Sequence, residues 1–329
     1  MTSSAISLIN TAIGYKTTKE EWTKENINLS AFSGELTAII GANGSGKSTI
    51  IKSIVRILKL KKGEIKVFNK NIEDFSAEEF AKTISYVGGA ATQVGFLTVR
   101  ELAAYGLYPH RTFFQKRTFE DEKRIDQALI ATDVKHLENK YIDAISDGER
   151  QRAMIARAIV QDTPIILLDE PTAFLDVIHR NVLINNMLNW CRKLNKTIVF
   201  STHEIADALR TCDRIWLIGN QCSEGIPEEL LFQNAFVELF EDKNFKLNLN
   251  NYNFESESKT TIPISIEKVE DSIYQLTVNL VKRMGFSLVE DSNLSIRFSK
   301  INNEYCWQID DRCFKKVNDL SIFLKPFLV

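Results

Sequence analysis

Short apolar runs before residue 240 predict the strands of a buried sheet. Residues 36–40, 165–168 and 197–200 are almost entirely apolar, as in parallel strands that helices cover on both faces. Residues 47–58, soon after the first run, carry apolar residues at helical spacing. This pattern predicts an α/β fold for the first part of the chain.

The pattern changes near the C-terminus, where short runs alternate between apolar and polar residues. With helical stretches at 272–284 and 317–324, they predict a small α+β domain of order βαβββα over residues 261–329. The segment before it, about 241–260, is rich in Asn, Ser and Glu and predicts a linker. Residues 1–240 would then form the main domain.

Composition and charge narrow the function classes. The 329 residues are 44% hydrophobic and 26% charged, with a net charge of −2. These values are typical of a globular protein, and without a basic field we expect no nucleic-acid partner. The chain shows no signal-peptide pattern and no run near the roughly 18 apolar residues of a membrane helix. Any membrane role is expected to come through partners.

The five cysteines contain no CxxC pair and cannot all pair, because their number is odd. We expect them to stay reduced, as in a cytosolic protein. Cys306 and Cys313 have no histidine nearby, which disfavours a zinc site at that position.

A phosphate-binding loop is predicted between the first strand and the first helix. Its residues match the GxxxxGK[ST] pattern. The glycines let backbone amides surround phosphates, Lys47 supplies a positive charge and Ser48 can bind Mg²⁺. The strand–loop–helix context predicts a nucleoside triphosphate site. The residues expected to contact the nucleotide here are Gly41, Asn43, Gly44, Ser45, Gly46, Lys47, Ser48 and Thr49.

Two carboxylates follow the strand 165–168, at the end where α/β sheets place ligand-binding groups. Asp169 is expected to reach Mg²⁺ directly or through water. Glu170 is expected to polarise a water against the γ-phosphate, the alternative being a solvated strand-end carboxylate. His203 follows the strand 197–200, which we expect beside the metal-site strand, and a γ-phosphate contact is predicted for it.

A second helix start also favours an anion. Ser146 directly precedes a run of helix-forming residues in "ISDGERQRAMIARAI". A serine at this position starts helices, and the open N–H groups of the first turn can hold phosphate. The chain therefore has two predicted phosphate-binding helix starts.

Together these segments resemble the ATPase subunits of ABC transporters. The loop "GANGSGKS" resembles the Walker A motif, and "IILLDE" the Walker B strand with its catalytic glutamate. "ISDGE" resembles the family signature, "AFLD" the D-loop and His203 the switch histidine. The resemblance covers about residues 7–231. It implies a P-loop NTPase core with a helical subdomain at about 94–160.

The resemblance also implies ligands and a second copy of the chain. ATP and Mg²⁺ are the expected cofactors, and Tyr15 matches the aromatic residue that stacks on adenine, the alternative being a partly buried tyrosine at a strand end. Ser146 and Gly148 are expected to contact the phosphate of ATP bound to the other subunit of a homodimer. Asp176 of the D-loop is also expected at the nucleotide.

Two positions depart from the family pattern. The signature usually reads Leu-Ser-Gly-Gly-Gln, so Asp147 adds a negative charge near a phosphate unless it turns outward or caps the helix. The family glutamine that approaches the metal falls on Gly89. Gln93 could replace that glutamine only if the loop is remodelled, for which Gly88 and Gly89 give freedom.

Residues 97–114, with the pattern "TVREL…YG…P", resemble importer ATPases for iron–siderophore complexes, haem or cobalamin. The resemblance implies that about residues 88–114 bind the transmembrane permease subunits, and that a substrate-binding protein acts indirectly. The ATPase would then lie at the cytoplasmic face of the membrane as a peripheral protein. Aromatic residues are frequent here and are typical of an interface, the alternative being the subdomain core; they are Phe96, Tyr105, Tyr108, Phe113 and Phe114.

Two rival hypotheses stay open. The chain could be a soluble ABC-type ATPase that acts on ribosomes or nucleic acid, although it has a single Walker A loop and no sustained heptads. It could also be a catalytically weak regulatory cassette, because Gly89 replaces the usual glutamine.

Overall fold

The computed structural model describes residues 4–16, 21–89, 96–111, 116–236, 245–248, 253–256, 262–269, 272–301 and 304–328. The chain divides into two compact units, Met1–Lys243 with Leu247–Phe254, and Asn244–Lys246 with Glu255–Val329. Each unit has a hydrophobic core of its own. Within the described residues, no helix combines the length and apolar character needed to cross a lipid bilayer.

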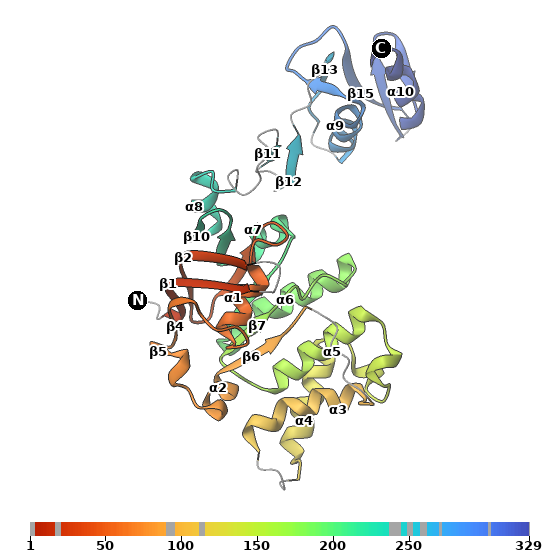
Figure 1. The fold of residues 1–329 in the computed structure, drawn as a ribbon. Coiled ribbons are helices and arrows are strands. Elements are labelled where there is room, and N and C mark those ends of the chain that lie inside the picture. The colour runs from red at the N-terminus through yellow and green to blue at the C-terminus, as the bar shows by residue number, and fades with distance from the viewer. Residues whose placement is uncertain are drawn as a thin grey trace. The chain divides into compact units, whose positions relative to one another are not determined.

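A six-stranded sheet forms the centre of the first unit, in the order β10-β9-β3-β8-β7-β6. Figure 1 labels β6, β7 and β10 of this sheet. All neighbours pair in parallel except β10, which is antiparallel to β9. Every residue of β3, β7 and β8 is buried, which confirms the buried parallel strands predicted from the apolar runs. The strands are β3 (Leu36–Ile40), β6 (Ile84–Val87), β7 (Ile165–Leu168), β8 (Thr197–Ser201), β9 (Arg214–Ile218) and β10 (Cys222–Gly225).

Apolar side chains cover both faces of this sheet, and β3 shows the alternation. Leu36 and Ala38 belong to the cluster that includes side chains of α6 (Val177–Leu194), α7 (Ile205–Thr211) and α8 (Pro227–Phe232). Ile39 belongs to the opposite cluster, with α1 (Lys47–Ile54). Successive side chains of a strand point to opposite faces, so β3 contributes side chains to the apolar clusters on both faces of the sheet.

Helix α1 is shorter than the predicted 47–58. It ends at Ile54, and Arg56 has a backbone φ of 62°. This left-handed conformation cannot continue a right-handed helix. The apolar residues that extend the helical pattern beyond Ile54 therefore lie in a turn.

An antiparallel sheet of order β2-β1-β4-β5 packs on the α1 side. Its apolar side chains join those of α1, the helix that follows the phosphate-binding loop, in one cluster. The strands are β1 (Ser4–Lys16), β2 (Glu21–Phe32), β4 (Lys62–Val67) and β5 (Lys70–Asn71), followed by the 3-10 turn η1 (Ile72–Asp74) and α2 (Ala77–Thr83).

The helical subdomain packs around its own apolar cluster. Capping boxes start α3, α4 and α5, with a Ser or Thr hydroxyl accepting from a backbone N–H three residues later. Gly106 lets η2 approach α5 closely, because a Cβ there would lie 2.3 Å from Arg157 O. The elements are α3 (Val99–Ala104), η2 (Tyr105–His110), α4 (Phe119–Ala131), η3 (Lys135–Leu137), η4 (Ile142–Ala144) and α5 (Asp147–Val160).

The second unit contains a five-stranded sheet of order β14-β13-β15-β16-β17. Strand β13 lies between β14 and β15 and is parallel to both, and the last three strands form an antiparallel meander. The Trp307 indole N–H donates to Thr277 Oγ1 at 2.8 Å inside the core. The elements are β13 (Ile262–Ile266), α9 (Ser272–Met284), β14 (Phe286–Leu288), β15 (Ser295–Ile301), β16 (Glu304–Ile309), β17 (Arg312–Phe314), α10 (Val317–Leu324) and η5 (Lys325–Leu328).

Two differences from the sequence prediction lie near the C-terminus. The segment predicted as a linker contains β11 (Phe245–Asn248) and β12 (Asn253–Ser256), which form a two-stranded sheet. The predicted order βαβββα also omits β17, whose three residues are too few to show an alternating pattern.

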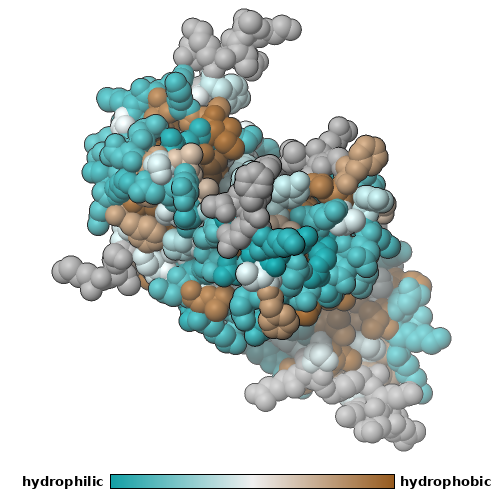
Figure 2. Space-filling view, turned by 90° about the horizontal axis from the view of Figure 1, so that it is seen from below, coloured by the Kyte–Doolittle hydropathy of each residue, from teal (hydrophilic) through white to brown (hydrophobic). Residues whose placement is uncertain are grey.

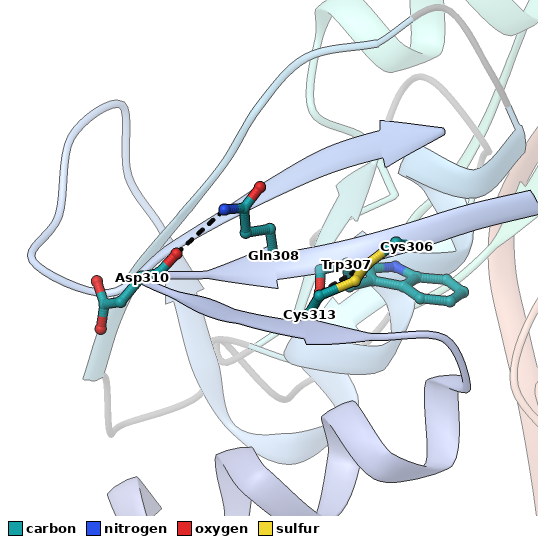
Figure 3. The surroundings of a disulfide bond; sticks show 5 residues. All are labelled: Cys306, Trp307, Gln308, Asp310 and Cys313. Carbon is teal, nitrogen blue, oxygen red and sulfur yellow. Dashed lines mark hydrogen bonds between the residues drawn. A yellow bond between two sulfur atoms is a disulfide. The ribbon is translucent and has the colours of Figure 1, made fainter. Parts of the chain in front are cut away.

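A disulfide joins Cys306 of β16 to Cys313 of β17 (Figure 3). Cys313 pairs with Gln308 across the two strands, and Cys306 lies two residues before Gln308, on the same face of the strand. The expectation that all cysteines are reduced is therefore wrong for this pair. It failed because the hairpin that brings the two sulfurs together depends on β17.

Candidate functional site

A cavity of about 150 Å³ lies at the loop between β3 and α1. Seven of the predicted nucleotide contacts line it, together with Glu170 from the end of β7. Those seven residues are Tyr15, Asn43, Gly44, Gly46, Lys47, Ser48 and Thr49. The structure therefore brings the predicted adenine-stacking residue to the same cavity as the phosphate loop.

The loop backbone has the conformation that an anion site needs. Gly44 and Gly46 have φ values of 77° and 108°, which favour glycine. Gly46 precedes α1 and no side chain caps that helix start, so its first N–H groups are open to a phosphate. Gly41 must lack a side chain, because a Cβ there would lie 2.5 Å from Ile218 O.

Lys47 is held inside the loop. Its Nζ donates to Gly41 O at 2.8 Å and to Ala42 O at 3.1 Å, and the side chain is buried. Burial lowers the pKa of Lys47, while the nearby carboxylates of Glu170 and Asp169 oppose this shift. A buried ammonium that faces two carboxylates and a curved backbone is ready to pair with a polyphosphate.

Asp169 is the centre of a set of oxygen atoms. Its Oδ1 accepts from Ser48 Oγ at 2.9 Å and from Ser201 Oγ at 2.8 Å. One carboxylate and one hydroxyl fit Mg²⁺, which takes oxygen ligands and keeps several waters. No cluster of three or more His, Cys, Asp or Glu side chains suited to a metal occurs in the described part of the chain.

Glu170 is placed by two contacts from β8 and the residues after it. Its backbone N–H donates to Ser201 Oγ at 2.8 Å, and its Oε1 accepts from His203 Nε2 at 2.9 Å. The backbone φ of Glu170 is 51°, a left-handed conformation that costs energy for a non-glycine residue and is frequent at functional sites. Strand β8 pairs with β7, so the expectation that His203 lies beside the metal-site strand is met by the sheet order.

Ser201 is a site residue that the sequence reasoning missed. It is fully buried and connects the Asp169 carboxylate to the Glu170 backbone. The available signal was a polar residue at the end of an apolar strand, two positions before His203.

The signature segment, residues 145–149, does not contribute to the lining of this cavity. Ser146 caps α5, as predicted from the sequence, and Asp147 turns toward Arg150, with Oδ1 2.9 Å from Nη1. Gly148 packs against the D-loop, because a Cβ there would lie 2.6 Å from Phe174 O. Asp176 caps α6 by accepting from His179 N at 2.9 Å, and it does not line the cavity either.

The position of the missing family glutamine lies beside the metal-site strand. A Cβ on Gly89 would be 3.0 Å from Asp169 O and 3.7 Å from Glu170 Cβ. Gln93, suggested as a substitute, lies outside the described residues.

A second, larger cavity of about 530 Å³ lies between the helical subdomain and the core of the first unit. Tyr86, Tyr105, Tyr108 and Pro109 are among its lining residues, and Tyr105 and Tyr108 are exposed. We call this cavity of about 530 Å³ the lateral groove. Figure 2, which views the molecule from below, shows a mostly hydrophilic surface on which apolar side chains form separate patches. The predicted partner residues Phe113 and Phe114 lie outside the described residues.

The comparisons with known proteins agree with this geometry. The family profile described as "ABC transporter" matches residues 24–173. The petrobactin import ATP-binding protein FpuC of Bacillus anthracis is 34% identical over 223 residues, which are 67% of this chain and 82% of the relative. The chain belongs to the ABC transporter ATP-binding proteins. The ferric enterobactin transport ATP-binding protein FepC of Escherichia coli K12 is 34% identical over 63% of this chain and 77% of its own length.

Solved structures of ABC cassettes share the fold of this ABC-type ATPase. The dimeric structure of the bacterial cassette MJ0796 is 28% identical, with a TM-score of 0.60 over 68% of this chain and 98% of that chain. The same cassette bound to ADP and phosphate is 26% identical, with a TM-score of 0.57 over 66% of this chain and 97% of that chain. ABC cassettes bind nucleotide, as the complex with ADP and phosphate shows for MJ0796. The two import relatives, FpuC and FepC, leave about a third of this chain unmatched.

Proposed function

We propose that this ABC-type ATPase powers an importer for an iron complex, a siderophore or haem, or for cobalamin. The permease would be a separate protein, and a substrate-binding protein would deliver the cargo to it. The support comes from the import relatives for petrobactin and enterobactin and from the "TVREL…YG…P" pattern. The subunit would lie peripherally at the cytoplasmic face of the membrane.

The observation that carries the ATPase proposal is that Lys47 and Glu170 line one cavity, while Asp169 accepts a hydrogen bond from Ser48 of the same lining. The loop amides and Lys47 would hold the phosphates of ATP. Ser48 and Asp169 would hold Mg²⁺, which neutralises charge on the phosphates. Glu170 would polarise the attacking water. His203, which already contacts Glu170, would orient that carboxylate and reach the γ-phosphate.

The same site argues for a homodimer. The signature segment lies away from the cavity of its own subunit, yet it has the capped helix start and the small Gly148 that suit a phosphate. Two copies related by a twofold axis would each cover the ATP of the other. ATP would favour the closed dimer and ADP would release it, which is a switch driven by differential binding.

The lateral groove is the proposed binding site for a permease helix. Its lining includes exposed aromatic side chains, which are frequent at protein interfaces. The groove also touches the signature helix α5, because Arg157 Nη2 donates to Tyr86 O at 2.7 Å and Gln161 Nε2 donates to Ala81 O at 2.7 Å. A permease helix bound in the lateral groove would contact Tyr86 and Ala81, which are hydrogen-bonded to side chains of α5 and of the residue that ends it. Helix α5 begins with the signature segment.

The test uses Glu170→Gln in the full chain. This variant should bind ATP, form an ATP-dependent dimer and lose turnover. Normal hydrolysis by Glu170→Gln would contradict the assignment of Glu170. Co-purification of the wild-type chain with a membrane permease supports import, whereas capture of ribosomes or DNA would favour the soluble mechanoenzyme. A wild-type rate equal to background would favour the regulatory cassette.

A further inference from the structure

Glu149 occupies the donors of the signature serine. The Ser146 backbone N–H and the Ser146 hydroxyl both lie 2.8 Å from the same oxygen, Glu149 Oε2. In return, the Glu149 backbone N–H donates to Ser146 Oγ at 3.3 Å. Two donors at the start of α5 thus converge on one anionic oxygen.

An incoming phosphate would need these same donors. In the proposed dimer, Ser146 and Gly148 approach the γ-phosphate of ATP bound to the other subunit. A hydroxyl can donate only one hydrogen bond, so Ser146 cannot serve Glu149 and a phosphate oxygen together. The carboxylate therefore holds the position of an anion at a helix start that attracts anions.

Glu149 also brings the charge that opposes a phosphate. Hydrogen bonds from the Ser146 backbone and then from its hydroxyl hold the pKa of Glu149 below its usual range, with smaller effects of Arg152 and Lys140. Asp147, the other carboxylate of the segment, pairs with Arg150, whose guanidinium also reaches Ile142 O. In the described part of the chain, Glu149 has no such ion pair.

Capping alone does not set this glutamate apart. Ser76 with Glu79 forms the same reciprocal box at α2, with distances of 3.2 Å and 2.9 Å. That box lies on an element without a predicted nucleotide role, whereas the Ser146 box lies on the signature. The two boxes share the reciprocal capping bonds, although Glu79 also pairs with Lys70 at 3.2 Å. Because they differ in location, Glu79 serves as the control for capping in a test.

We propose that Glu149 is a built-in competitor of the γ-phosphate, and so a positioning residue that sets the ATP concentration at which the dimer closes. It accepts from Ser146 in the open subunit and must give up these bonds when ATP of the second subunit arrives. This inference rests on the proposed function, because it requires that the signature covers ATP across a dimer.

The experiment measures ATP-dependent dimerisation by light scattering in the full-length Glu170→Gln protein. Adding Glu149→Gln keeps a side chain that can cap the helix and removes its charge. The ATP midpoint for dimer formation should fall by about three- to tenfold. Glu79→Gln, added to the same background, should leave the midpoint within about twofold. In the wild-type background, Glu149→Gln should lower KM for ATP more than it changes kcat.

The outcomes separate the inference from the function on which it rests. An unchanged or higher midpoint in a Glu149→Gln protein that keeps its thermal midpoint would overturn the inference, and so would an equal fall in Glu79→Gln. If the Glu170→Gln parent binds ATP but never dimerises, the proposed dimer itself fails, whatever Glu149 does. Dimerisation of the parent with a lower midpoint only in Glu149→Gln supports both.

Discussion

His203 Nε2 lies 2.9 Å from Glu170 Oε1, although 33 residues separate them along the chain. The pairing of β8 with β7 brings them together. The contact joins Glu170, the proposed water-activating carboxylate at the end of β7, to His203, which follows the neighbouring strand β8. Most of what can be tested about this ATPase concerns how its carboxylates are held.

Replacing His203 should slow hydrolysis more than it weakens ATP binding. In His203→Ala the Glu170 carboxylate loses its hydrogen bond, so we expect kcat to fall by about 10²-fold with nucleotide affinity within about threefold. Steady-state ATPase assays and fluorescent-nucleotide titration measure the two quantities. His136→Ala, on the 3-10 turn η3, is the control, and a similar loss there would contradict a specific role.

Ser201→Ala should lower both stability and activity. The hydroxyl is fully buried and serves Asp169 and the Glu170 backbone, so its removal leaves buried polar groups unpaired at a cost of about 1–3 kcal/mol. Ser85 is the matched control, because its buried hydroxyl on β6 has no hydrogen-bond partner. Urea unfolding should show Ser85→Ala within about 0.5 kcal/mol of the wild type, and equal losses in the two variants would refute the assignment.

Gly89→Ala should impair hydrolysis more than Gly88→Ala. A Cβ on Gly89 meets the Asp169 backbone carbonyl at 3.0 Å, whereas one on Gly88 meets the end of the Tyr86 side chain at 3.1 Å. Displacing Asp169 disturbs the proposed metal site, and we expect at least about a threefold loss of ATPase rate for Gly89→Ala. The comparison uses assays at saturating Mg²⁺, and a larger loss in Gly88→Ala would show that the Gly89 contact is not limiting.

Stability should fall at alkaline pH partly through Cys191. Burial raises the pKa of this thiol from 9.0 to about 12, so the folded state favours the neutral thiol. Its contribution is full below pH 9 and is lost as pH rises toward 12, because the unfolded chain releases the proton first. Between pH 8 and 10 the wild type should lose about 1 kcal/mol more unfolding free energy than Cys191→Ala. Parallel pH profiles of the two proteins would contradict this cause.

Local patterns were sufficient for several elements of the fold. The apolar runs 36–40 and 165–168 coincide with β3 and β7, and the helical spacing at 272–284 and 317–324 coincides with α9 and α10. Side-chain periodicity and the glycines of the phosphate loop depend on the backbone and near neighbours. These features can therefore be recognised without the rest of the molecule.

The remaining features depend on which distant segments become neighbours. Ser201 joins the site because β8 lies beside β7, and Cys306 bonds Cys313 because β17 is paired with β16. The Ser146 backbone N–H and hydroxyl both donate to the Glu149 carboxylate. The capping pattern in the sequence is compatible with these two hydrogen bonds but does not require them. The sequence by itself determined the strands, the phosphate loop and the helix starts, because each is a local preference. Only the tertiary structure decided which side chains meet, because strand order and side-chain packing involve residues that the local pattern does not describe.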